Sequence, residues 1–411
     1  MAAIHERNYP VTLEELDRWY PRVPVEENSA VVFSKAFACL SGQFNPSFLA
    51  NDKSTDLPPQ DESPADPPKQ TTEGYLGENV DALAFLHQAS NIPRSRFPIN
   101  LGKLSIMPYP HLGKIVRSAH LLQTEAANHV AGTSPESAVR SVESLFALSR
   151  SLAKEPLVRS HLARLDSQRI AVGSLQHVLN GASLTDDQLG VLGVALEQGD
   201  DQRELARAFI GQRCIGIHSF NLLRDTTDLT DLHVARAHSL GQRLLVNCTV
   251  FFSSPQYLYD SAGFIQWDEL NYLYLMDRYI QTAQTDFPER IAVAQVLRRS
   301  LEQQNGLHAF SRAWLRGMNG SGIILRDATV TARLRAARVA VAVERYRVAH
   351  HELPQTLVEL TPFGSRGVPI DPFDGQPLRY QPLTPGYVVY SVGEQGDGDG
   401  TQDDLAFLVK R

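Results

Sequence analysis

The histidines that could carry chemistry do not stand in a known catalytic or metal-binding pattern. His111, His120 and His129 are spaced nine residues apart, which on a continuous helix turns His120 half a turn away from the other two. They therefore do not predict a three-histidine metal site, and a surface or capping role is favoured. The pair His350-His351 lacks the four-residue spacing of two metal ligands on one helix face, so it is expected at a helix C-terminus.

The acidic residues and the short motifs name no reaction either. The sequence contains no G-x-S-x-G or G-x-x-x-x-G-K-[ST] motif. The paired carboxylates Asp186-Asp187 and Asp200-Asp201 are expected at helix starts, where negative charge complements the helix dipole. A non-enzymatic binding or scaffold protein is therefore the leading hypothesis. The alternative is a hydrolase-like enzyme, because carboxylates and histidines from separate helices can converge in space without a local pattern.

The positive charges do not predict a nucleic-acid surface. The formal net charge is -7, which gives no general electrostatic reason to bind nucleic acid or an anionic membrane. Arginines near the C-terminal end of the chain scatter around the axis of their predicted helix, and Glu344 interrupts them. These arginines are Arg333, Arg335, Arg338, Arg345 and Arg347. A solvated helix with exposed cations is favoured.

Composition is that of an ordinary globular protein, with 43% hydrophobic and 21% charged residues. The three cysteines, Cys39, Cys214 and Cys248, are far apart and predict small buried side chains rather than a disulfide framework. No run of about 18 apolar residues occurs, so no membrane-spanning helix is expected. Export or anchoring would require a signal outside this chain, and the compartment stays open.

Helical periodicity dominates from Asn79 to about Gln304. Helices are predicted at 27–40, 111–130, 136–152 and 155–180, and the short connections favour antiparallel neighbours. The run from Thr124 to Gly132, followed by Glu136 to Leu152, loosely resembles one tetratricopeptide-type helical hairpin. No strict 34-residue period accompanies it, so a helical-hairpin bundle is predicted rather than a regular array.

Residues 51–74 interrupt this helical pattern. The segment is dense in proline, aspartate, serine and glutamine and offers few apolar side chains to bury. It cannot offset its ordering entropy by burial, so a mobile loop is predicted. A docking peptide is the alternative.

The last residues, 326–411, predict a compact α+β unit, called here the C-terminal unit. A long helix at 326–350 precedes a short helix at 355–360 and strand-like runs that include 387–391 and 405–409. One helix packed on three antiparallel strands is a stable arrangement, because the helix covers one face of the sheet. Its core is predicted to include Val341, Val348, Leu378, Tyr380, Val388, Tyr390 and Phe407.

The C-terminal unit resembles the globular domain of the major pseudopilins of type II secretion. The resemblance rests on the order of turn elements after the long helix, over about 80 residues. These are Leu353-Pro354, Asp371-Pro372-Phe373, Gly375-Gln376-Pro377, Tyr390-Ser391 and Gly393 with the acidic loop behind it. Pseudopilins also carry a cleaved leader and a hydrophobic N-terminal helix, which this sequence lacks, so a fibre subunit is not expected.

The resemblance implies a calcium site in the loop before the last strand. The candidate ligands in this loop are Asp397, Asp399, Asp403 or Asp404, with Gln395 and backbone carbonyls, and a role for Asp397 or Asp399 goes beyond what the resemblance implies. Calcium takes several oxygen ligands, and crowded carboxylates repel one another without a cation. Gln395 departs from the family, where an aspartate stands, and Asp404 is the best-matched acid. A solvated acidic hairpin loop is the alternative.

Together these patterns divide the chain at 1–50, 51–74, 75–325 and 326–411. The predicted fold is mainly α: a helical-hairpin bundle followed by a small pseudopilin-like α+β unit. The predicted partner is an unidentified protein, without nucleic acid and without a membrane span. The resemblance adds association with the cell envelope or a secretion apparatus as a further hypothesis.

Overall fold

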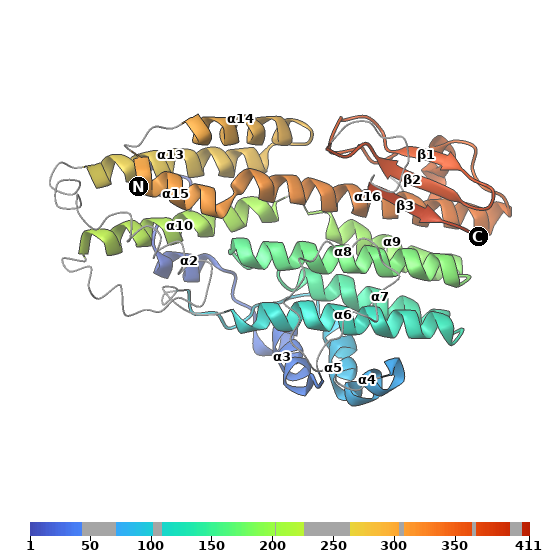
Figure 1. Ribbon diagram of the computed structural model, residues 1–411. Coiled ribbons are helices and arrows are strands. Elements are labelled where there is room, and N and C mark those ends of the chain that lie inside the picture. The colour runs from blue at the N-terminus through green and yellow to red at the C-terminus, as the bar shows by residue number, and fades with distance from the viewer. Residues whose placement is uncertain are drawn as a thin grey trace, which may run out of the picture.

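The computed structural model describes residues 1–42, 71–101, 109–201, 203–225, 264–303, 308–363, 367–394 and 405–411. In these residues the chain is mainly helical, with one three-stranded antiparallel sheet near the C-terminus (Figure 1). This confirms the predicted fold class. No helix in these ranges is both long and apolar enough to cross a lipid bilayer.

The N-terminal part forms short helices that pack on the side of the bundle. Thr12 and Glu15 form a capping box, in which each side chain accepts a hydrogen bond from the other residue's backbone N–H. The elements are α1 (Ala2–Glu6), α2 (Leu13–Trp19), η1 (Val25–Glu27), α3 (Ser29–Cys39), α4 (Thr72–Glu78) and α5 (Val80–Ser90). Helix α4 begins inside the range 51–74, so the predicted loop extends too far at its end. Residues 51–70 lie outside the described part of the chain.

The centre of the bundle is a series of long helices joined by short connections. They are α6 (Pro110–Ala131), α7 (Pro135–Arg150), α8 (Val158–Gly181), α9 (Asp186–Gly199) and α10 (Glu204–Asp225). Proline stands in the first turn of α6 and of α7, where its missing N–H has no helical partner to lose. Helices α6, α7 and α8 pack on one another, as the predicted antiparallel hairpins require.

A second group of helices packs against α10. It comprises α13 (Phe264–Gln284), α14 (Glu289–Gln303), α15 (Ala309–Met318) and the long α16 (Gly320–His350). These helices share a hydrophobic core in which Phe209 and Phe220 of α10 meet Tyr272 and Tyr279 of α13. His351 ends α16 in the left-handed conformation, so the histidine pair stands at a helix C-terminus as predicted.

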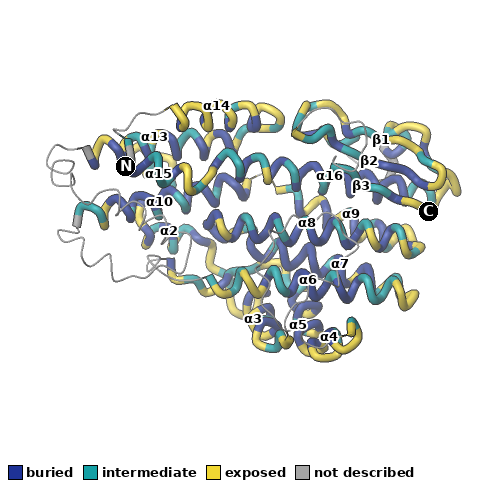
Figure 2. The backbone as a smooth tube through the Cα atoms, in the orientation of Figure 1, coloured by how far each residue is buried: buried dark blue, intermediate teal, exposed yellow. Residues whose placement is uncertain are grey.

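Helix α16 joins the bundle to the C-terminal sheet. It begins at Gly320 rather than near 326 and packs on α8, α9 and α14 as well as on two strands. The predicted boundary at 326 therefore falls inside a helix. One hydrophobic cluster continues from α8 and α9 through α16 to the sheet, so the C-terminal unit shares its core with the bundle (Figure 2).

The sheet consists of β1 (Arg379–Pro382), β2 (Tyr387–Ser391) and β3 (Leu405–Val409), in the order β1-β2-β3, and follows the short helix η6 (Leu357–Phe363). Tyr380, Val389 and Phe407 stand opposite one another across the three strands. Together with Tyr387 they face the shared hydrophobic cluster.

The predicted core of the C-terminal unit is partly wrong. Val341, Leu378 and Phe407 are buried in the shared cluster, and Tyr380 packs against it. Val388 is buried but lies on the opposite face of β2 from Val389, and Tyr390, which shares that face, is only partly buried. Val348, near the end of α16, is 40% exposed.

Val389→Ala is expected to lower the free energy of unfolding by about 2 kcal/mol, because it removes fully buried methyl groups from the shared cluster. Val348→Ala makes the same change at an exposed position and is expected to stay within about 0.5 kcal/mol of wild type. Urea unfolding of both variants measures the difference. Equal losses would contradict the placement of the helix-facing side of β2.

Candidate functional site

The residues predicted as calcium ligands cannot be placed. Gln395, Asp397, Asp399, Asp403 and Asp404 lie outside the described residues. Among the residues that are described, no group of three or more histidine, cysteine or acidic side chains could hold a metal ion. The calcium site therefore stays a prediction.

One histidine and one carboxylate meet between α5, α6 and α7. His87 Nε2 lies 3.0 Å from Glu125 Oε2, and His87 Nδ1 lies 2.8 Å from Ser144 Oγ. The hydroxyl of Ser141 donates a second hydrogen bond to the Glu125 carboxylate, over 2.7 Å. Burial raises the pKa of Glu125, but hydrogen bonds from His87 and Ser141 and the charge of His87 outweigh it and hold that pKa below its usual value.

A second histidine–carboxylate pair lies between α6 and the start of α8. His111 Nε2 lies 3.0 Å from Glu155 Oε1, and the hydroxyl of Ser160 donates to the same oxygen over 2.5 Å. The ring of His111 stacks on Phe97 with 4.8 Å between the ring centroids. The predicted surface or capping role is therefore wrong for His111, and also for His120, which is 8% exposed.

A third pair lies where α8, α14 and α16 meet. His161 Nε2 lies 3.1 Å from Asp327 Oδ1, and Arg290 Nη1 donates to Asp327 Oδ2 over 3.1 Å. All three residues are buried. Arg290 also stacks over the ring of Phe287, with 4.3 Å between the guanidinium carbon and the ring centroid.

In the three clusters the side chains lie within hydrogen-bond distance of one another, but a substrate could not reach them. A nucleophile must reach a substrate, and Ser144, the hydroxyl that faces His87, is fully buried. Each cluster instead links side chains from helices that pack together in the core. Their chemistry is that of satisfied buried polar groups, which fix how the helices sit against one another.

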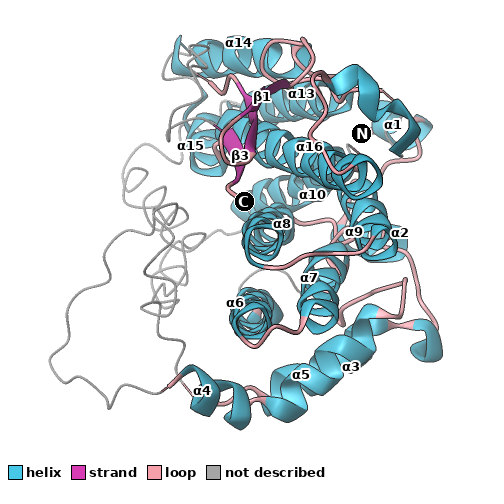
Figure 3. Cartoon of the chain, turned by 90° about the vertical axis from the view of Figure 1, so that its right-hand side faces the viewer, coloured by secondary structure: helices cyan, strands magenta, loops and turns pink. Residues whose placement is uncertain are grey.

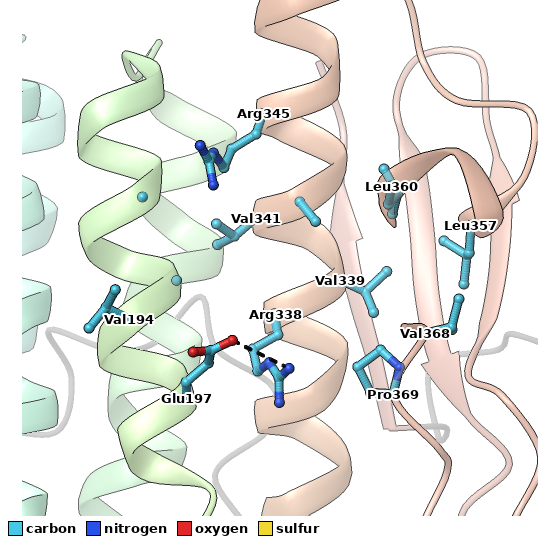
Figure 4. A pocket seen from close by; sticks show the side chains of 13 residues that line it. Val194, Glu197, Arg338, Val339, Val341, Arg345, Leu357, Leu360, Val368 and Pro369 are labelled. Carbon is cyan, nitrogen blue, oxygen red and sulfur yellow. Dashed lines mark ion pairs between the residues drawn. The ribbon is translucent and has the colours of Figure 1, made fainter. Parts of the chain in front are cut away.

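An open groove runs between α9, α16 and η6 (Figure 4). Its volume is about 230 Å³. Its walls are mostly apolar: Val194 comes from α9, Val341 from α16, and Leu357 and Leu360 from η6. The remaining apolar lining is Gly190 and Gly193 of α9, Val339 and Ala342 of α16 and the segment Val368-Pro369, and the charged residues of the lining are Glu197, Arg338 and Arg345.

Ion pairs hold the two helices of this groove in place. Arg345 donates to both carboxylate oxygens of Asp186 at the start of α9, over 2.7 and 2.9 Å. Arg335 donates to Asp200 at the other end of α9, over 3.1 Å. The predicted solvated face of α16 is therefore wrong for these two arginines. Asp200 is also the C-cap of α9 and not a helix start.

A third arginine of α16 also pairs with an acid of α9 beside the groove. Arg338 lies on α16 between the other two, and its Nη2 is 3.7 Å from Glu197 Oε1 of α9. Figure 4 shows this pair at the lower end of the groove. The charged side chains around the groove are thus paired with one another. A ligand would therefore meet the apolar walls of the groove.

Comparison with known proteins returned no match. No family model matches the chain, and no curated protein and no solved structure matches it significantly. The class that the fold defines is a helical bundle whose longest helix also carries a small antiparallel sheet.

Proposed function

We propose that this chain is a non-enzymatic binding protein and that the α9–α16 groove receives a large apolar side chain of a protein partner. The observation that supports this most is the groove itself, with apolar walls from Val194, Val341 and Leu357. Apolar anchors in such pockets dominate the binding energy of protein interfaces.

The size of the groove supports a side chain rather than a free small molecule. Sites for drug-sized ligands have volumes of about 300–1,000 Å³. The groove, at about 230 Å³, is smaller and open along one side. Val194 is 55% exposed beside it and adds apolar surface that a partner would cover.

The burial of the histidine clusters favours binding over the hydrolase-like alternative. Glu125 and Ser144 lie on packed helices, away from solvent, so the side chains that resemble a catalytic relay have no free face for a substrate. The pseudopilin-like C-terminal unit forms one side of the groove. If the chain shares the cellular role of the pseudopilins as well as this resemblance, the partner belongs to a secretion apparatus of the cell envelope.

The variant Gly193→Trp tests the groove, because a side chain at this position enters it beside Val341. Peptides selected from a random library against the wild-type chain are expected to carry a Trp, Phe or Leu anchor. Their affinity for Gly193→Trp should fall at least tenfold, or about 1.4 kcal/mol. The measurement is fluorescence anisotropy of labelled peptides.

The matched control is Gly77→Trp. Gly77 is also a helical glycine with open space around it, but it lies on α4, away from the groove. This variant should bind the selected peptides as wild type does, and both variants should melt close to wild type. Selected peptides that lack a large apolar residue, or that bind Gly193→Trp unchanged, would contradict the proposal.

A further inference from the structure

A second and larger cavity lies on the other side of α9. It is bounded by the end of α5, by α7 and by α9, and its volume is about 510 Å³. Figure 3 shows α9 between α7 and α16, so the cavity and the α9–α16 groove flank the same helix. The polar side chains that line it are Ser90, Asn91, Arg140, Glu143, Arg150 and Gln198.

The charged lining comes from one face of α7. Arg140, Glu143 and Arg150 are spaced by three and seven residues, which brings them to the same side of the helix. Two guanidinium groups against one carboxylate give the cavity one net positive charge when Glu143 is ionised. The cavity therefore attracts a singly charged anion more than a neutral or cationic molecule.

Arg150 supplies the donor that this anion would meet. Its Nη1 is buried and has no hydrogen-bond partner among the described residues. A buried guanidinium N–H without an acceptor costs free energy, and an oxyanion in the cavity would satisfy it. Burial lowers the pKa of Arg150, which the charge of Glu143 only partly opposes. The group remains protonated, because an arginine does not lose its proton in a folded protein.

The rest of the wall is apolar. Val191 and Val194 of α9 line the cavity, and Val191 is 43% exposed. Hydrocarbon attached to the anionic group would cover these side chains and gain from the transfer out of water. The volume lies within the range of small-molecule sites, about 300–1,000 Å³.

We infer that the cavity between α5, α7 and α9 binds a small carboxylate with an apolar portion. The carboxylate pairs with Arg150 and Arg140, and the hydrocarbon lies along Val191 and Val194. A phosphate fits less well, because its second negative charge would face Glu143 inside the same cavity. The cavity shares Gly190 and Val194 of α9 with the α9–α16 groove, whereas its charged residues Arg140, Glu143 and Arg150 line the cavity and not the groove.

Hexanoate and its neutral counterpart hexanamide test the charge requirement on the full chain. Calorimetric titration should show saturable binding of hexanoate, and hexanamide should bind at least tenfold more weakly. Inorganic phosphate, which lacks an apolar portion, should also bind at least tenfold more weakly. Equal binding of hexanoate and hexanamide would overturn the oxyanion site, and phosphate binding as tight as hexanoate would overturn the role of the apolar wall.

Two substitutions in the cavity should change affinity in opposite directions. Arg150→Gln should weaken hexanoate binding at least tenfold, because it removes the guanidinium whose buried Nη1 has no acceptor among the described residues. Glu143→Gln should strengthen it severalfold, because it removes a carboxylate that repels the ligand. Damage to the fold could only weaken binding, so the gain in Glu143→Gln cannot come from misfolding. Arg140→Gln, at an exposed position, offers a second loss-of-binding variant if Arg150→Gln does not fold.

Arg298→Gln is the control, because Arg298 is an exposed arginine of α14 that pairs with Glu302 on its own helix. It should bind hexanoate as wild type does. Arg150→Gln should leave peptide binding unchanged, because Arg150 lines the cavity and not the α9–α16 groove, so failure of the cavity is distinguishable from failure of the groove. Unchanged hexanoate affinity in both Arg150→Gln and Arg140→Gln would overturn the inference.

Discussion

Asp327→Ala is expected to lower the free energy of unfolding by about 3–5 kcal/mol, because it leaves a buried cation without its partner. Asp327 accepts hydrogen bonds from His161 and Arg290 where α8, α14 and α16 meet. Arg290 is 1% exposed, so its guanidinium cannot turn to water when the carboxylate is removed. Whole domains unfold at about 5–15 kcal/mol, so this single loss is a large share.

Asp166→Ala is the matched control for this prediction. Asp166 of α8 forms an ion pair with Arg326 of α16, so this pair also joins two packed helices, but both side chains are partly exposed. Exposed ion pairs contribute about 0–1 kcal/mol, so the loss should be no larger than that. Urea unfolding at neutral pH compares the two variants. Similar losses in both would show that the buried cluster does not hold the three helices together.

The stability difference between wild type and Asp327→Ala should depend on pH, in the direction that the pKa shift of Asp327 sets. Burial raises the pKa of Asp327, but the hydrogen bond and charge of His161 and the charge of Arg290 outweigh it and hold that pKa below its usual value. A carboxyl whose folded pKa is depressed stabilises the fold above its unfolded pKa, about 3.9. The stability gap between wild type and Asp327→Ala should therefore shrink as pH falls below about 4.

Local signals in the sequence were enough to predict several of the helices. The capping box of Thr12 and Glu15 and the prolines at the starts of α6 and α7 act within one turn, so adjacent residues reveal them. Gly181 ends α8 within one residue of its predicted end. The predicted start of α16 at 326 is wrong: the helix begins at Gly320, because the side chain of Asn319 caps it.

The buried clusters left no such signal. His87 and Glu125 are 38 positions apart, and His161 and Asp327 are 166 positions apart. No spacing rule links residues at these separations, since only the packing of helices brings them together. The same holds for the arginines of α16. Arg345 pairs with Asp186, which is 159 positions earlier, and Arg335 pairs with Asp200, which is 135 positions earlier.

The sheet shows where periodicity stops being informative. Alternation correctly places Val388 with Tyr390 on one face of β2. It does not say which face meets α16, because Tyr387, Val388 and Val389 are all apolar and either parity offers a hydrophobic surface. The contact of Tyr387 with α16 decides it: its hydroxyl donates to Glu344, a buried carboxylate of that helix, over 3.0 Å.

A buried carboxylate also holds the C-terminal unit together. Asp371 is fully buried, and its Oδ1 accepts from the Ser391 hydroxyl over 2.8 Å and from the Phe373 N–H over 3.0 Å. Its Oδ2 accepts from the Val392 N–H and from Arg379, each over 2.9 Å. One side chain thus joins the turn before β1, the start of β1 and the end of β2.

Asp371→Ala is therefore expected to cost about 3–5 kcal/mol, because it removes the acceptor of four donors at once, among them the buried Ser391 hydroxyl. Asp374→Ala is the control: Asp374 also accepts from Arg379 and from a turn N–H, but it is exposed. Its loss should cost about 1 kcal/mol or less.

Hydrogen exchange distinguishes a local from a global effect. The amides of β2 should lose protection in Asp371→Ala and keep it in Asp374→Ala. Because Val389 and Phe407 share one hydrophobic cluster with α16 and α9, we expect the loss to appear in global unfolding as well. Loss of protection in β2 with unchanged global stability would instead show that the C-terminal unit opens on its own, against the shared core.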